Sequence, residues 1–225
     1  MSISPVRAFA FFDVDETLIS IKSMVSFQDY WFIATGDDEA RASFWRDMAR
    51  LRDGKASRET LNRCYYASFA GRAVGAVADL AVAWFNEMSA TTRDLFHPSV
   101  VAALFRHQDI GQEAVLVSGS FPALLSPIAA RLGVRHILAS DMEVADGCYT
   151  GRILPPQTIG LGKAEAMTAF LQRAGVSPSR CHAYGDDISD LPMLGAVGWP
   201  VVVREDDAEM VAVARSRGWP VLSPR

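Results

Sequence analysis

The chain has 225 residues, of which 50% are hydrophobic and 21% are charged, and its formal net charge is −4. This composition is typical of a globular protein with one sizeable core and room for a small accessory domain. The acidic balance and the scattered basic residues argue against nucleic-acid and membrane-surface binding. No segment approaches the ~20 apolar residues of a membrane helix, and the first apolar stretch is too short for a signal peptide. Because the three cysteines lie far apart without metal-ligand spacing, we expect a reduced, cytoplasmic protein.

The first element is an apolar run at residues 8–12, which predicts a short buried strand that ends at Asp13 and Asp15. Two carboxylates held close together repel each other unless a cation or a shared proton lies between them. Carboxylate and carbonyl oxygens are the ligands of hard divalent cations, so Mg2+ is the candidate. An isolated pair of this kind fits a solvated acidic turn equally well, and the rest of the chain has to decide.

Residues 22–88 carry aromatic and aliphatic side chains at helical spacing, with Gly36 and Gly54 at plausible helix ends. This pattern predicts three or four helices. Because no strand signal follows until Glu113, we expect these helices to be inserted between two strands of one sheet.

From Pro98 onward, helices and apolar strands alternate. The predicted helices cover residues 99–108, 121–132, 163–174, 188–194 and 208–217. The predicted strands cover residues 114–117, 137–139, 142–144, 148–152, 182–184 and 201–203, with a last one around Val221, and a hairpin turn separates 142–144 from 148–152. This alternation predicts a parallel sheet covered on both faces, whose ligands bind beyond the carboxyl ends of the strands.

Three further polar features stand where this architecture places a site. Ser118 follows an apolar strand, Lys163 begins a helix after a glycine-containing stretch, and the acidic residues Asp186, Asp187 and Asp190 follow another strand. Each feature alone fits a helix cap or a solvated side chain. Together, all near strand ends, they predict one site that binds an anion and a metal.

In order and spacing, Asp13-x-Asp15-x-Thr17, Ser118, Lys163 and Gly185-Asp186-Asp187-x-x-Asp190 resemble the four motifs of the haloacid dehalogenase-like (HAD) phosphohydrolase superfamily. The resemblance implies a Rossmann-like α/β core with a three-layer parallel sheet architecture, formed by residues 1–20 and 97–225. Residues 21–96 then resemble the all-helical C1 cap of subfamily IB, whose members are similar to phosphoserine phosphatases.

The resemblance also implies a Mg2+-dependent phosphomonoesterase. Asp13 is then the nucleophile that becomes an aspartyl phosphate, and Asp15 the group that protonates the leaving alcohol and deprotonates water. Enzymes of the superfamily that dehalogenate lack this second aspartate, so Asp15 favours phosphoryl transfer. The implied metal ligands are Asp13, the main-chain carbonyl of Asp15, Asp186 and Asp190. The residues implied to bind the phosphate, or to lie beside it, are Ser118, Lys163, Glu16, Gly119 and Thr17. Of these, Thr17 is expected to brace the turn.

The substrate is expected to be a small phosphate ester. Phosphoserine phosphatases carry a glutamate nine residues after the nucleophile that binds the substrate's amino group, and this chain has Lys22 there. A cation at that position disfavours phosphoserine and favours an anionic or hydroxyl-rich leaving group. Other cap residues considered are Gln28, Tyr30, Arg46 and Arg52. Two alternatives stay open: a phosphotransferase or mutase on the same fold, and a catalytically silent binding module. The sequence does not indicate the oligomeric state.

Overall fold

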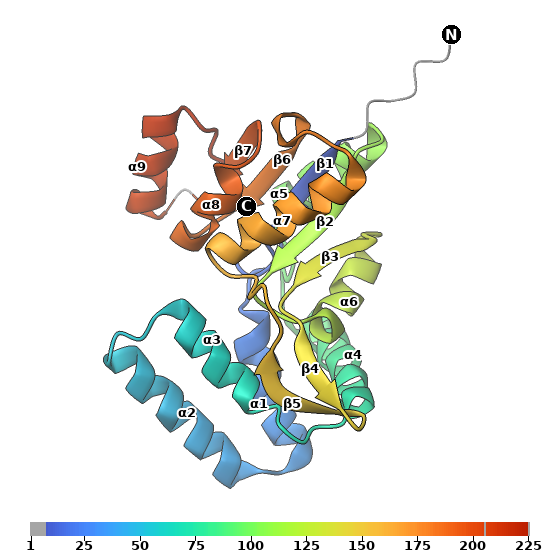
Figure 1. The fold of residues 1–225 in the computed structure, drawn as a ribbon, viewed down its shortest axis with the longest axis vertical. Helices are drawn as coiled ribbons and strands as arrows, with labels where there is room; N and C mark the ends of the chain where they lie inside the picture. The colour runs from blue at the N-terminus through green and yellow to red at the C-terminus, as the bar shows by residue number, and fades with distance from the viewer. Residues whose placement is uncertain (1–7, 205, 225) are drawn as a thin grey trace.

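The computed structural model describes residues 8–204 and 206–224. Its centre is a five-stranded sheet in the order β3-β2-β1-β6-β7, in which all neighbouring strands are parallel (Figure 1). These strands are β1 (Phe9–Phe12), β2 (Glu113–Ser118), β3 (His136–Ala139), β6 (His182–Gly185) and β7 (Trp199–Val202). The predicted Rossmann-like parallel sheet is confirmed.

The central strand, β1, is buried along its whole length, because helices cover both faces of the sheet. Phe9 and Phe11 point to one face, where they pack with residues of α7 (Leu161–Ala174), α8 (Leu191–Leu194) and α9 (Ala208–Arg217). Ala10 and Phe12 point to the other face, with residues of α5 (Pro98–Asp109) and α6 (Pro122–Arg131). This alternation is the two-residue period of a strand, and it explains why the run reads as continuously apolar.

The register of β1 decides where the site forms. Phe12 is level with Leu116 of β2 and with Tyr184 of β6. The Asp13 N–H extends this pairing by donating to the Tyr184 carbonyl at 2.9 Å. The ends of three strands that are distant in sequence therefore meet at one edge of the sheet.

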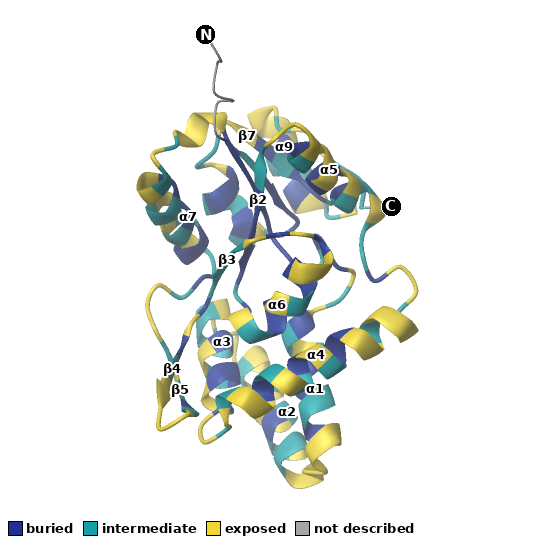
Figure 2. Cartoon of the chain, turned by 90° about the vertical axis from the view of Figure 1, so that its right-hand side faces the viewer, coloured by how far each residue is buried: buried dark blue, intermediate teal, exposed yellow. Residues whose placement is uncertain are grey.

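Five helices lie between β1 and β2. The first four agree with the prediction of three or four helices over residues 22–88, and they are α1 (Ser23–Thr35), α2 (Asp38–Asp53), α3 (Arg58–Ala67) and α4 (Val74–Thr91). They form a layer beyond the carboxyl ends of the strands (Figure 1), with their buried faces turned inward (Figure 2). Gly36 ends α1 in the left-handed conformation with φ 68°, and Gly54 ends α2.

The predicted hairpin is present as β4 (Met142–Ala145) and β5 (Cys148–Ile153), which pair antiparallel outside the main sheet. It lies against the helical layer (Figure 1), where Cys148 forms a β-bridge with Ala73. A Cβ on Gly151 would come within 3.0 Å of the Ala67 carbonyl oxygen, which shows how closely β5 approaches α3.

The helix predicted at 188–194 is present as two consecutive pieces, a 3-10 turn at Ile188–Asp190 and the short α8. The strand predicted around Val221 is shorter than expected and is an isolated bridge to Val202. The short apolar run there is not enough to form a regular strand.

No helix in the described part of the chain is long and apolar enough to cross a lipid bilayer. The division into a core of residues 1–20 and 97–225 and a cap of residues 21–96 stays a prediction. Residues 1–7 of that core lie outside the described residues.

Candidate active site

The floor of the site is a buried lysine held between two buried aspartates. Lys163 Nζ lies 2.5 Å from Asp13 Oδ1 and 2.6 Å from Asp190 Oδ1. The side chains of Lys163, Asp13 and Asp190 are at most 8% exposed. Such a triad is stable only because opposite charges and hydrogen bonds compensate for the loss of water.

The position of Lys163 depends on a close contact between the backbone at the start of α7 and the segment before it. It lies in the first turn of α7, directly after Gly162. A Cβ on Gly162 would be 1.8 Å from the carbonyl oxygen of Gln157, so only glycine fits between that backbone and the helix. The glycine-containing stretch before Lys163 is therefore a packing requirement of the site.

A second acidic group follows β6. Asp190 Oδ2 accepts hydrogen bonds from the N–H groups of Asp186 and Asp187, both at 3.2 Å. The Asp187 side chain accepts in turn from Ser189 N–H at 2.8 Å, which completes a capping box around the turn. Gly185 leaves room for this fold-back, because a Cβ there would lie 2.6 Å from Asp190 Cβ.

Both oxygens of Asp186 have a donor. Thr17 Oγ1 donates to Asp186 Oδ1 at 2.8 Å, and Arg204 Nη1 donates to Asp186 Oδ2 at 3.3 Å. Thr17 thus links the first motif to the last, as the expected brace of the turn would. Sequence reasoning missed Arg204, although it follows an apolar strand, the signal that identified the other site residues.

Burial controls the protonation of the site. Burial raises the pKa of Asp15 to about 6, with Ser23 opposing the shift, and raises the pKa of Asp186 to about 6. Burial also raises the pKa of Asp13, which the charge of Lys163 opposes. Burial disfavours the charged form of Lys163, but Asp13 and Asp190 outweigh it and hold the pKa of the lysine above its usual range.

Three carboxylates are placed to share a cation. One oxygen from each of Asp13, Asp186 and Asp190 lies within 4.8 Å of the others, and all three residues are buried. An all-oxygen donor set of high negative charge suits a hard divalent ion such as Mg2+. The main-chain carbonyl of Asp15 stays a predicted fourth ligand.

These groups open into a cavity of about 410 Å³ between the sheet and the helical layer. The predicted site residues that line it are Asp13, Asp15, Glu16, Lys22, Ser118, Gly119, Lys163, Asp186 and Asp190. The structure therefore brings together residues from four separate motifs. A second cavity, about 320 Å³, is lined by residues such as Gln108, Gly133 and His136, and none of the predicted site residues lines it.

The helical side of the cavity comes from α1, α2 and one face of α3, and sequence reasoning missed the face of α3. Arg58, Leu61, Asn62 and Tyr65 line it. Arg58 pairs with Asp187 at 2.7 Å, and Asn62 donates to the Gly119 carbonyl at 3.2 Å. The spacing of these residues is that of a single helical face, which is the signal that could have identified them.

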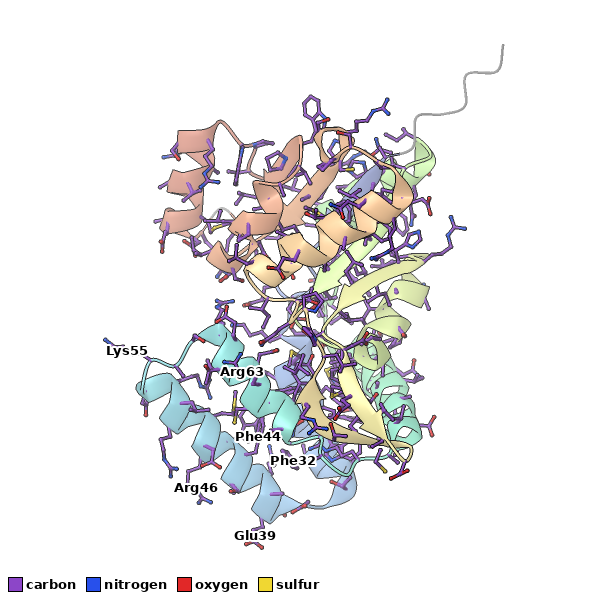
Figure 3. All side chains as sticks on the ribbon, in the orientation of Figure 1. Phe32, Glu39, Phe44, Arg46, Lys55 and Arg63 are labelled. Carbon is purple, nitrogen blue, oxygen red and sulfur yellow. The ribbon has the colours of Figure 1, made fainter. Side chains whose placement is uncertain are left out.

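Of the residues in the helical layer that the sequence suggested as substrate contacts, some line the cavity and others do not. Lys22 lines the cavity and pairs with Glu16 at 3.2 Å, and Arg52 also lines it. Gln28, Tyr30 and Arg46 are not among the described residues that line it. Gln28 is buried and donates to Ser68, whereas Arg46 points away from the molecule on the outer side of α2 (Figure 3).

A family model described as haloacid dehalogenase-like hydrolase matches residues 10–195. A probable phosphatase of Mycobacterium tuberculosis is 35% identical over 231 residues, which cover 96% of this chain and 75% of that protein. A phosphoserine phosphatase of the same organism is 31% identical over 232 residues, covering 96% of this chain and 70% of that protein. The crystal structure of a Bordetella pertussis protein of unknown function is 27% identical, with a TM-score of 0.84 over 98% of this chain and 100% of that chain.

Proposed function

Because this chain belongs to the haloacid dehalogenase-like hydrolase family and is a phosphatase, we propose that it hydrolyses a small phosphate monoester through a phosphorylated Asp13, with Mg2+ as its metal. One observation carries the proposal. Asp13, Lys163 and Asp190 form a buried charged triad, with Asp186 beside it, at the floor of a cavity about 410 Å³ in volume.

In the first step, Asp13 attacks phosphorus, and the bond between phosphorus and the ester oxygen breaks. Asp15 gives its proton to the departing alkoxide, so the leaving group departs as a neutral alcohol. A pKa of about 6 suits this role, since it keeps part of the Asp15 population protonated near neutral pH. Lys163 and Ser118 bind phosphoryl oxygens, with backbone amides near Glu16 and Gly119.

In the second step, water attacks the phosphorus of the aspartyl phosphate and gives a proton to Asp15. The bond between Asp13 and phosphorus breaks, and inorganic phosphate leaves. Lys163 compensates the negative charge of Asp13 before the attack, because Asp13 and Asp190 hold the pKa of the lysine above its usual range. In the second step its charge faces the phosphoryl oxygens. Asp13, Asp186 and Asp190 would hold a divalent cation, which when bound would supply further positive charge to the site.

The leaving group is proposed to be anionic or hydroxyl-rich and not that of phosphoserine. Lys22 supports this, because it lines the cavity at the position nine residues after Asp13. A cation there repels an ammonium group and attracts an anion.

Replacing Asp13 tests the mechanism. With p-nitrophenyl phosphate and Mg2+, we expect Asp13→Asn to lower kcat by at least about 10³-fold, because the nucleophilic carboxylate is lost. Mass spectrometry of rapidly quenched wild-type enzyme should find a phosphoryl group on the peptide that contains Asp13. Asp79→Asn, an exposed position on α4, is the matched control. Robust Mg2+-dependent turnover by the folded Asp13→Asn protein would contradict the mechanism.

A further inference from the structure

Two adjacent tyrosines on α3 differ in one respect. Tyr65 and Tyr66 are both buried, at 4% and 0% exposure. The Tyr66 hydroxyl donates to the Gly119 carbonyl at 2.8 Å. The Tyr65 hydroxyl is buried and has no hydrogen-bond partner among the described residues. An unsatisfied buried hydroxyl destabilises the fold, whereas a phenylalanine at the same place would not.

The Tyr65 hydroxyl cannot easily turn away to find a partner, because its ring is packed on several sides. The ring lies edge-on to Phe44, with centroids 6.0 Å apart, and edge-on to Tyr66 at 5.5 Å. It also contacts Phe69 at 5.4 Å. Rotation of a tyrosine about its Cβ–Cγ bond leaves the hydroxyl oxygen on the same axis. The oxygen is therefore held at one point.

Tyr65 lines the same cavity as Asp13 and Asp15, on the side formed by the helical layer, where the leaving group is expected. In the proposed reaction Asp15 protonates the ester oxygen of the leaving group. The neighbouring wall is apolar at Met24 and Leu61. Next to this apolar wall, the Tyr65 hydroxyl, which has no protein partner among the described residues, can donate a hydrogen bond to the substrate.

We propose that the Tyr65 hydroxyl donates a hydrogen bond to an oxygen carried by the leaving group, so that the enzyme selects phosphate monoesters of oxygen-bearing alcohols such as polyols. This inference rests on the proposed function and deepens it. A site built to hydrogen-bond a substrate oxygen rejects an analogue that lacks the oxygen, because the protein group is then left unsatisfied.

Two esters of equal chain length isolate this contact: glycerol 3-phosphate and n-propyl phosphate. We expect the wild-type enzyme to prefer glycerol 3-phosphate in kcat/KM, and Tyr65→Phe to reduce that preference about tenfold. Tyr66→Phe is the matched control. It removes a hydroxyl that holds the Gly119 backbone, so it should change kcat/KM for both esters by the same factor and leave their ratio unchanged. An unchanged ratio in Tyr65→Phe would overturn the inference.

Two measurements separate this inference from the proposed function and from folding. Calorimetric binding of glycerol 3-phosphate to Asp13→Asn needs no turnover, and adding Tyr65→Phe to that variant should weaken binding about tenfold. Equal affinity with and without the hydroxyl would refute the role of Tyr65 even if no ester were hydrolysed. Thermal unfolding without ligand should give Tyr65→Phe a melting temperature equal to or above that of the wild type, and a large decrease would show that the hydroxyl has a partner within the protein.

Discussion

We expect Lys22 to determine whether the enzyme prefers an anionic or a cationic leaving group. Its side chain is 58% exposed and pairs with Glu16 at the edge of the cavity, so it is available to a ligand and is not part of the core. Exposed ion pairs contribute little to stability, which means that replacing Lys22 tests recognition more than folding.

We expect Lys22→Glu to shift preference from an anionic to a cationic leaving group. Phosphoglycolate and phosphoethanolamine form a matched pair, and their kcat/KM ratio should change by about tenfold or more in favour of phosphoethanolamine. Lys55→Glu makes the same charge change in the exposed turn between α2 and α3 (Figure 3), and should leave the ratio as it is. Equal ratios in wild type and Lys22→Glu would show that Lys22 does not meet the leaving group.

At the scale of single elements, α3 connects the helical layer to the site. Its N-terminal residue, Arg58, reaches Asp187 in the loop after β6, and Asn62 and Tyr66 hold the Gly119 carbonyl after β2. Gln157, just before α7, donates to Asn62 Oδ1 at 2.7 Å. One helix therefore contacts three of the loops that carry the predicted motifs.

The N-terminus of α7 gives a prediction about backbone packing. Gly162→Ala places a methyl group where the Gln157 carbonyl already lies, so the first turn of α7 and the adjacent Lys163 must move. We expect a loss of about 1–3 kcal/mol in the free energy of unfolding and a decrease in kcat of at least about tenfold.

The control is Gly75→Ala on α4, where a new Cβ meets nothing within 4 Å. It should keep full activity and stability, with a gain of up to about 1 kcal/mol from helix propensity. Chemical denaturation and steady-state kinetics measure both variants. If Gly162→Ala behaves like Gly75→Ala, the close approach to Gln157 does not determine the position of Lys163.

For the whole molecule, a pair of histidines, His107 on α5 and His182 on β6, links stability to pH. The rings of His107 and His182 are 4.4 Å apart, and His107 Nε2 is 2.9 Å from the Tyr184 hydroxyl. Burial, and then the charge of His107, lowers the pKa of His182 to about 4, and burial lowers the pKa of His107. Both histidines are therefore neutral in the folded protein near pH 7.

A histidine with a lowered folded-state pKa stabilises the fold above its unfolded pKa of about 6.5, and this contribution is lost as the pH falls toward 4. We expect the difference in unfolding free energy between wild type and His182→Gln to decrease by about 1 kcal/mol from pH 7.5 to pH 5, after allowance for solvent screening. Urea denaturation at both pH values measures it. A difference that does not change with pH would contradict a neutral, half-buried His182.

The location of the site was predictable from local sequence because it depends on where parallel strands end. Asp13, Ser118 and Asp186 each follow an apolar run, and the carboxyl ends of parallel strands meet at one edge. The order of these residues, with Lys163, also carried the family resemblance, and residues 10–195 match that family. The roles assigned to the individual residues stay predictions.

By itself, the sequence determined the alternation of strands and helices, the parallel sheet and the positions of candidate site residues at strand ends, because period and strand ends are local properties of the chain. Only the tertiary structure decided that Lys163 lies between Asp13 and Asp190, that Arg204 reaches Asp186, and which face of α3 lines the cavity. These contacts join residues that are up to 150 positions apart. Their geometry follows from the packing of separate elements, for which no short stretch of sequence carries a signal.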